Sequence, residues 1–166
     1  MITPRPYQQD VVDGAVRLWR AGRRRIAAVL GTGGGKTVIF SMVAKMAHDA
    51  GLPVMVLAHR KELIDQAIGK LRDVNPEARV GRLQGTVKQY RADIVVGSVQ
   101  TASTPTSLAL LKTRRWGLVI IDEVHHGVAD TYMRVARELR CFDDDGPLLL
   151  GVTATPVRGD GIGLGE

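Results

Sequence analysis

A glycine-rich segment directly after a short apolar run restricts the possible folds of this chain more than any other feature. Residues 26–30 read Ile-Ala-Ala-Val-Leu, which is typical of a strand, and residues 31–37 read Gly-Thr-Gly-Gly-Gly-Lys-Thr. Consecutive glycines let the backbone curl so that several N–H groups point at one anion, and a helix that starts there adds its N-terminal dipole. The segment therefore predicts a phosphate-binding loop between a strand and a helix.

The residue types of this loop fit a nucleoside triphosphate with a magnesium ion. The backbone N–H groups that would surround the phosphate oxygens belong to Thr32, Gly33, Gly34 and Gly35. Lys36 is placed to reach the β- and γ-phosphates, and Thr37 offers a hydroxyl to Mg²⁺. The pattern departs from the usual loop at Leu30, where glycine is usual. An ordinary glycine-rich turn is the alternative, but Gly-Lys-Thr at a strand-to-helix junction favours the phosphate loop.

Two carboxylates follow a second apolar run and predict a metal and water site. Residues 118–121 are continuously apolar, as expected for a strand buried on both faces, and Asp122 and Glu123 come next. Asp122 can hold Mg²⁺ directly or through water, and Glu123 can orient and deprotonate an attacking water. A surface turn with two acids is the alternative. The phosphate loop upstream favours the catalytic interpretation, with Lys36, Asp122 and Glu123 as the catalytic residues.

Strand-like and helix-like segments alternate along the chain. Strands are expected at residues 26–30, 54–58, 94–96, 118–121 and 148–152. Helices are expected at residues 36–50, 61–74, 105–111 and 131–139, after an amphipathic helix that contains Val11, Ala15, Leu18 and Trp19. This alternation predicts an α/β domain with a mostly parallel central sheet and helices on both faces. The candidate polar segments all follow strands, so they should share the edge where such sheets bind ligands.

Composition is that of an ordinary globular domain. The chain has 166 residues, of which 45% are hydrophobic and 24% are charged, and its one cysteine, Cys141, excludes an internal disulfide. It shows no apolar run long enough to span a membrane and no apolar leader. We therefore expect a cytoplasmic, monomeric domain without a membrane partner. Residues 1–157 should form the domain, and the glycine-rich residues 158–166 should begin a linker.

The order of these segments resembles the first RecA-like domain of superfamily 2, DEAD/DEAH-box-like helicases and translocases, which is a P-loop NTPase fold. The similarity is greatest to the XPB/RadD-like branch and to the motor subunits of restriction enzymes. Residues 5–9 resemble the adenine-recognising segment, 31–37 motif I, 57–63 motif Ia, 97–101 the next strand-contacting motif, 122–125 a DEAH-like motif II, and 151–158 motif III. Motif II has Val124 in its third place.

The resemblance implies a role for each motif. Gln8, with Arg5, would read the adenine of ATP, although a polar residue that opens a helix is the alternative. The residues that would couple the nucleotide state to the partner domain and the nucleic acid are His125, Thr153 and Thr155. The residues that would contact the nucleic-acid backbone are Arg60, Ser98, Gln100 and Thr101. DNA is favoured over RNA as the partner, and ATP and Mg²⁺ are the implied cofactors.

The implied function is the ATP-binding N-terminal motor domain of an ATP-dependent DNA helicase or translocase. Such a domain hydrolyses ATP when a second RecA-like domain, in cis, supplies an arginine finger. Alone, residues 1–166 should be nearly inactive. Two alternatives stay open: a non-catalytic ATP-dependent nucleic-acid-binding module, and a different small P-loop enzyme such as a nucleotide kinase. The net charge of +6 permits nucleic-acid binding, but Arg23, Arg24 and Arg25 precede the first strand and should lie at the opposite edge as a solvated loop.

Overall fold

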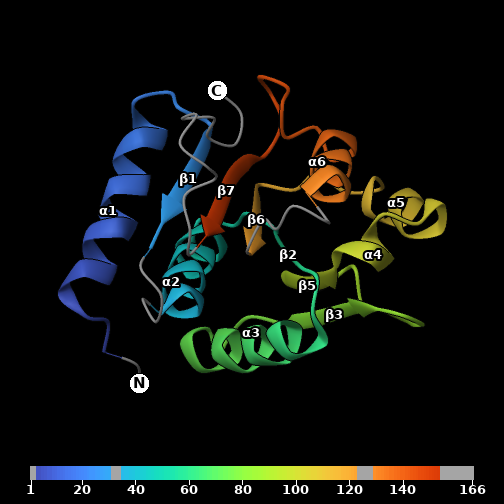
Figure 1. Cartoon of the computed structure of the whole chain (residues 1–166), viewed down its shortest axis with the longest axis horizontal. Helices are drawn as coiled ribbons and strands as arrows, with labels where there is room; N and C mark the ends of the chain where they lie inside the picture. The colour runs from blue at the N-terminus through green and yellow to red at the C-terminus, as the bar shows by residue number, and fades with distance from the viewer. Residues whose placement is uncertain (1–2, 31–34, 123–128, 154–166) are drawn as a thin grey trace.

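A mostly parallel sheet forms the centre of the computed structural model, which describes residues 3–30, 35–122 and 129–153 (Figure 1). The strands are β1 Arg25–Val29, β2 Val54–Ala58, β3 Val80–Gln84, β4 Val87–Lys88, β5 Ile94–Ser98, β6 Leu118–Asp122 and β7 Leu148–Thr153. In the described residues the sheet has seven strands in the order β1-β7-β6-β2-β5-β3-β4. All neighbouring pairs are parallel except β3 and β4. The predicted α/β architecture is confirmed.

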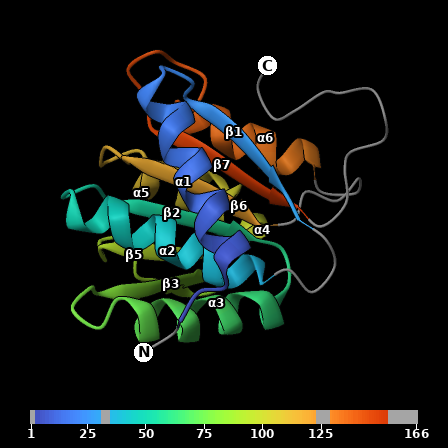
Figure 2. The same ribbon diagram turned by 90° about the vertical axis from the view of Figure 1, so that its left-hand side faces the viewer.

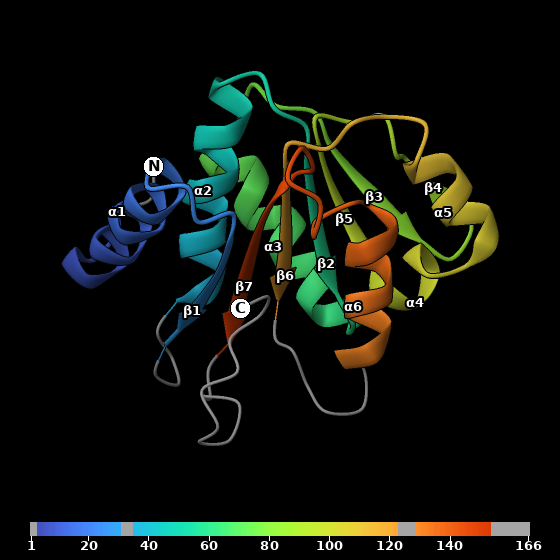
Figure 3. The ribbon, with the colours of Figure 1, turned by 90° about the horizontal axis from the view of Figure 1, so that it is seen from above.

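Helices cover both faces of this sheet, as Figures 2 and 3 show. The helices are α1 Pro6–Arg20, α2 Lys36–Asp49, α3 Lys61–Val74, α4 Val99–Ala102, α5 Pro105–Leu111 and α6 Ala129–Glu138. Because side chains alternate along a strand, Val54 and Val56 join the core beneath α1, α2 and α3, whereas Met55 joins the core beneath α4, α5 and α6. Strands β2, β5 and β6 are buried on both faces, which explains their continuous apolar sequences.

The helix ends follow from local residue types. Pro6 opens α1, and the backbone N–H of Arg5 donates to Oε1 of Gln8 at 2.8 Å, which satisfies the donor that precedes the helix. Helix α2 begins after Gly35, which has a φ of 69°, and is followed by Gly51 with a φ of 79°. Both positions need the left-handed backbone that glycine adopts without strain. In the described part of the chain, no helix is both long and apolar enough to cross a membrane.

Several predicted elements match the structure closely, and three elements were not predicted. The strand at 54–58 and the helices at 61–74 and 105–111 have the predicted bounds. Strand β3, strand β4 and the four-residue helix α4 were missed. The motif at 97–101 was predicted only to follow a strand; β5 extends into it as far as Ser98, and the rest of it lies in α4.

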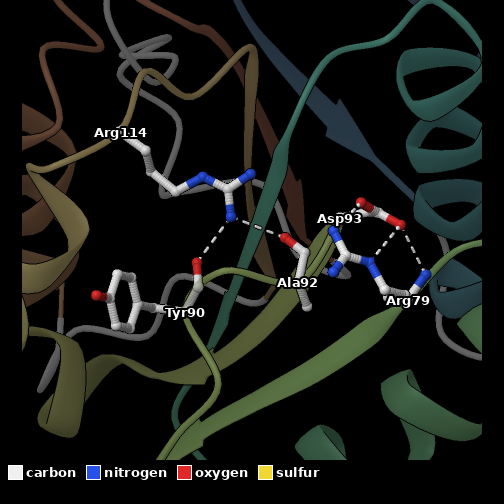
Figure 4. A network of polar contacts seen from close by, with 5 residues as sticks. All are labelled: Arg79, Tyr90, Ala92, Asp93 and Arg114. Carbon is white, nitrogen blue, oxygen red and sulfur yellow. Dashed lines mark hydrogen bonds and ion pairs between the residues drawn. The ribbon is translucent and has the colours of Figure 1, made fainter.

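The edge of the sheet where the strands begin is held together by arginines. Arg114 donates to the carbonyls of Tyr90 and Ala92, at 2.8 Å each, and its guanidinium lies 4.6 Å from the ring centroid of Trp116. Arg79 forms an ion pair of 3.0 Å with Asp93 in the same region (Figure 4). These contacts tie together the segments that enter β3, β5 and β6.

The arginine run before β1 lies at this edge too, as the sequence predicts. Arg25 is the first residue of β1 and pairs with Leu149, near the start of β7. The guanidinium of Arg24 donates to the carbonyl of Gly146, and that of Arg25 lies 5.6 Å from the ring centroid of Phe142. Two of the three arginines at 23–25 therefore brace the fold, rather than forming the solvated loop that was expected, and Arg23 is exposed.

Candidate functional site

Three neighbouring strands bring motifs I, II and III to one stretch of the sheet edge. The N–H of Leu30, just after β1, donates to the carbonyl of Thr153 at 2.9 Å, and Asp122 pairs with Val152. Strand β7 therefore lies between β1 and β6. Since adjacent strands are about 4.8 Å apart, the ends of β1 and β6 are separated by roughly 10 Å. Leu30 after β1, Asp122 at the end of β6 and the predicted coupling residue Thr153 thus lie on one stretch of the edge.

The start of α2 has the features of a phosphate site. Lys36 and Thr37 form its first turn and are half-buried, and Gly35 precedes them in the left-handed conformation. A Cβ at Gly35 would overlap the side-chain amide nitrogen of Gln8, so any other residue at this position would have to displace that amide. Leu30 is 6% exposed and continues the pairing of β1 with β7. It is therefore a core residue in extended backbone, which explains why glycine is not required there.

Asp122 is buried at the end of β6, on the face of the sheet that α2 covers. Its residue is 3% exposed, and Leu118 and Ile120 of the same strand belong to the core beneath α1, α2 and α3. Side chains two residues apart in a strand share a face, so Asp122 falls on the side that carries Thr37. From the opposite core, the hydroxyl of Tyr132 donates to the backbone carbonyl of Asp122 at 3.2 Å. The carboxylate and the start of α2 are thus on one side of the sheet.

The predicted adenine-reading residues lie next to this start of α2. Gln8 is 5% exposed and packs against Gly35, whereas Arg5 is exposed. A cavity of about 650 Å³ lies between Pro4, the exposed side of α2 and the turn after α3. Its lining includes Val38, two residues after Lys36, and Met42 one turn further. A volume of this size suits a small ligand. Pro4 and Val38 are the lining residues nearest in sequence to the predicted nucleotide residues, and most of the lining belongs to the second half of α2 and the turn after α3.

The predicted nucleic-acid residues follow β2 and β5, further along the same edge. Ala58 and Ser98 are directly paired, so Arg60 and α4 follow two adjacent strand ends. Arg60 and Gln100 are exposed. Ser98 is 7% exposed and caps α4: its hydroxyl accepts from the N–H of Thr101 at 3.3 Å and donates to Oε1 of Gln100 at 2.8 Å. The structure therefore presents Arg60 and Gln100 to solvent and uses Ser98 in the local fold.

Thr101 has a structural partner that the sequence analysis missed. Its Oγ1 accepts from the N–H of Gly85 at 3.0 Å, and Gly85 lies in the turn between β3 and β4. Lys88, in β4, donates to the hydroxyl of Ser107 at 2.7 Å. The turn at 85–86 is therefore held beside α4 at the same edge. A glycine between two short segments containing Leu83 and Val87 was the sequence signal for it.

Several predicted site residues lie outside the described residues: Thr32, Gly33, Gly34, Glu123, His125 and Thr155. The linker expected at 158–166 lies outside them as well. The roles assigned to these residues stay predictions.

Comparison with known proteins identifies the family. The family described as "Type III restriction enzyme, res subunit" matches residues 1–158. The chain belongs to this family. It is 34% identical over 167 residues to the putative ATP-dependent helicase IRC3 of Saccharomyces cerevisiae, covering 94% of this chain and 24% of that protein. It is 29% identical over 163 residues to the DNA 3'-5' helicase XPB of Kineococcus radiotolerans, covering 95% of this chain and 27% of that protein.

Solved structures confirm the fold of this member of the restriction-enzyme res-subunit family. The SWI2/SNF2 ATPase core domain of Sulfolobus solfataricus superposes with a TM-score of 0.75 at 19% identity, covering 95% of this chain and 32% of that chain. The same core in complex with dsDNA gives a TM-score of 0.74 at 18% identity, with 96% and 33% covered. The predicted RecA-like fold and the resemblance to a first RecA-like helicase domain are confirmed. The chain spans about a quarter of the length of the curated relatives named above.

Proposed function

We propose that this chain is the ATP-binding first motor domain of an ATP-dependent helicase or translocase that acts on nucleic acid. One observation carries the proposal: Lys36 and Thr37 open α2 after the end of β1, and Asp122 ends β6, which is separated from β1 by β7 alone, on the face that α2 covers. A phosphate-binding helix start and a buried carboxylate are thereby combined at one edge. The family match supports a motor ATPase over a nucleotide kinase.

The residues present fit a nucleotide with magnesium. Gly35 gives the phosphates close access to backbone N–H groups, and Lys36 supplies a positive charge at the same helix start. The oxygen donors of Thr37 and Asp122 are of the kind that Mg²⁺ prefers, and burial excludes water from the carboxylate. A bound Mg²⁺ would neutralise charge on the phosphates. Glu123, in the sequence directly after Asp122, would orient the attacking water.

Gln8 and Arg5 are proposed to select adenine. An amide side chain can donate and accept at once, and this is what the edge of adenine offers. Gln8 packs against the backbone of Gly35, so the residue proposed to read the base contacts the residue that precedes the phosphate-binding helix start. The cavity beside Pro4 and Val38 supplies apolar surface on which a base can lie.

DNA is the proposed polymer, contacted through its backbone by exposed Arg60 and Gln100. The name of the Kineococcus relative and the DNA-bound structural neighbour support DNA over RNA. A second RecA-like domain in cis would complete the motor, because phosphoryl transfer in such enzymes gains roughly 10³–10⁵-fold from an arginine finger. Residues 1–166 alone should therefore bind ATP and hydrolyse it very slowly.

Calorimetry of ATP binding tests the proposal directly. Lys36→Ala should weaken MgATP binding at least tenfold, since a charge-assisted contact contributes roughly 1.5–3 kcal/mol. The matched control is Lys112→Ala, which removes an exposed lysine, paired with Glu138 at 3.0 Å, that lies outside α2 and outside the cavity. Equal affinities of the Lys36 variant and the wild-type chain would refute the site assignment. Loss of affinity in the Lys112 variant would show that removal of any lysine is sufficient.

A further inference from the structure

Tyr132 is a large polar side chain that lies entirely within the core. It is 0% exposed and packs, with Val135 and Ala136 of α6, in the core beneath α4, α5 and α6. A buried phenol needs a hydrogen-bond partner for its hydroxyl, and leaving it without one is costly. Here the hydroxyl donates to the backbone carbonyl of Asp122 at 3.2 Å. A phenylalanine would fill the same apolar space, so what the tyrosine adds is this hydrogen bond and not packing.

The contact falls where the support of β6 by its neighbours becomes one-sided. The pairing between β6 and β2 ends at Ile121, whereas the pairing between β6 and β7 continues to Asp122. The backbone of Asp122 is therefore held by β7 within the sheet and by Tyr132 from the layer of α6. Because the carboxylate of Asp122 is carried by this last residue of the strand, its position depends on both supports.

Helix α6 is itself anchored independently of the nucleotide site. Val135 and Ala136 are both fully buried, and Arg134 donates to the carbonyl of Ser103, just after α4, at 3.3 Å. The hydrogen bond from Tyr132 thus connects the end of β6 to an anchored helix on the face opposite α2.

We propose that Tyr132 is a positioning residue for the metal-binding carboxylate of Asp122, an inference that rests on the proposed nucleotide function. It acts through the backbone and touches neither nucleotide nor metal. Without the hydroxyl, the carbonyl of Asp122 loses a fixed donor and the carboxylate samples more positions. The consequence should appear in the use of Mg²⁺ and should leave phosphate binding by Lys36 unchanged.

The test is calorimetry of a non-hydrolysable ATP analogue, with Mg²⁺ and with EDTA, on the wild-type chain and Tyr132→Phe. In EDTA the two affinities should agree within about twofold, because metal-free binding does not use Asp122. The gain in affinity produced by Mg²⁺ should be about three- to fivefold smaller in the variant, in keeping with the loss of one neutral hydrogen bond. An unchanged magnesium gain would overturn the proposal.

Two control variants separate positioning from general loosening. Val135→Ala weakens the packing of the same helix without removing the hydroxyl, so it should lower thermal stability and leave the magnesium gain as in the wild type. If it reduces the gain as much as Tyr132→Phe does, Tyr132 is merely structural. Tyr90→Phe removes a phenol hydroxyl elsewhere in the chain and should change nothing. Measurement at a temperature where thermal melts show every variant folded keeps the comparison valid if Tyr132→Phe is less stable.

A third variant distinguishes failure of this inference from failure of the proposed function. Asp122→Asn should abolish the magnesium gain if Asp122 holds the metal. If Asp122→Asn keeps the full gain, the metal assignment is wrong and the role of Tyr132 falls with it. If Asp122→Asn loses the gain and Tyr132→Phe keeps it, the site stands and the positioning role is refuted.

Discussion

The side-chain amide of Gln8 lies directly against the backbone of Gly35, so that a Cβ on Gly35 would overlap its nitrogen. Gln8 belongs to the first turn of α1, and Gly35 precedes the first turn of α2. The two residues come from segments that the resemblance assigns to the base and to the phosphates. Their contact means that the base and the phosphates of a bound nucleotide would be supported by two residues that touch each other.

Replacing Gly35 with alanine should therefore damage nucleotide binding more than it damages the fold. The φ of 69° alone costs an alanine roughly 1–2 kcal/mol, and the overlap with Gln8 must also be relieved by moving the amide. We expect at least tenfold weaker ATP binding by calorimetry. Gly51→Ala is the matched control: its φ is 79°, it follows the other end of α2, and its Cβ would meet nothing within 4 Å. Similar losses of stability with unequal losses of affinity would support the contact; equal affinities would contradict it.

Nucleic-acid binding should depend on Arg60 rather than on the arginines before β1. Arg60 follows β2 at the edge that carries the predicted motifs, whereas Arg24 and Arg25 brace the opposite edge. Arg60→Ala should weaken binding of single-stranded DNA and reduce the slope of log K against log[salt] by about 0.7, the value of one phosphate contact. Replacing residues 23–25 with alanine should lower the melting temperature and change DNA affinity less. Fluorescence anisotropy at several salt concentrations measures both, and the reverse ranking would place the binding face elsewhere.

The buried central strands could be predicted from sequence because each is a continuous apolar run. Strand β3 could not, because Gly81, Arg82 and Gln84 interrupt its pattern, and Leu83 is its one fully buried large side chain. It is a strand because it pairs with β5 along its length, a tertiary effect that local propensity does not report. Helix α4 has four residues, which is too short to show a helical pattern, so the N-cap at Ser98 specifies it instead.

The candidate site could be predicted as far as chain order determines it. A parallel sheet places every motif at one edge, so the shared edge of Lys36, Asp122 and Thr153 follows from the alternation of strands and helices. Their proximity along that edge depends on the spatial order β1-β7-β6, which was not predicted. The hydrogen bonds that position residues at this edge could not be predicted in the same way. Gly85 lies sixteen residues before its acceptor Thr101, and Tyr132 lies ten residues after the carbonyl of Asp122. Such pairs have no sequence signature of their own.

The thiol of Cys141 should be inert in the folded chain. It is fully buried, and burial raises its pKa from 9.0 to about 12. Both inaccessibility and the scarcity of thiolate at pH 8 oppose its reaction with a disulfide reagent. We expect negligible labelling of the native chain and one labelled thiol per chain in urea, followed by absorbance of the released thiolate. Rapid labelling without denaturant would show that the turn between α6 and β7 opens readily.

Asp93 should stabilise the fold in a way that depends on pH. Its carboxylate accepts from the guanidinium of Arg79 at 3.0 Å and from the backbone N–H of Arg79 at 2.8 Å, and these bonds hold its pKa below the ordinary value. A carboxyl group whose pKa is lowered by folding stabilises the native state above the unfolded pKa of about 3.9, and this contribution is lost as the pH falls through the folded pKa. Asp93→Asn should therefore lower the urea midpoint modestly at pH 7, because Arg79 is largely exposed, and the difference from the wild type should shrink below about pH 4.

The control is Asp144→Asn, which changes an exposed acid that forms none of the ion pairs found in the described part of the chain. Urea titrations from pH 7 to pH 3 measure both variants. A difference for Asp93→Asn that stays constant over this range would mean that the ionic contact with Arg79 does not stabilise the fold.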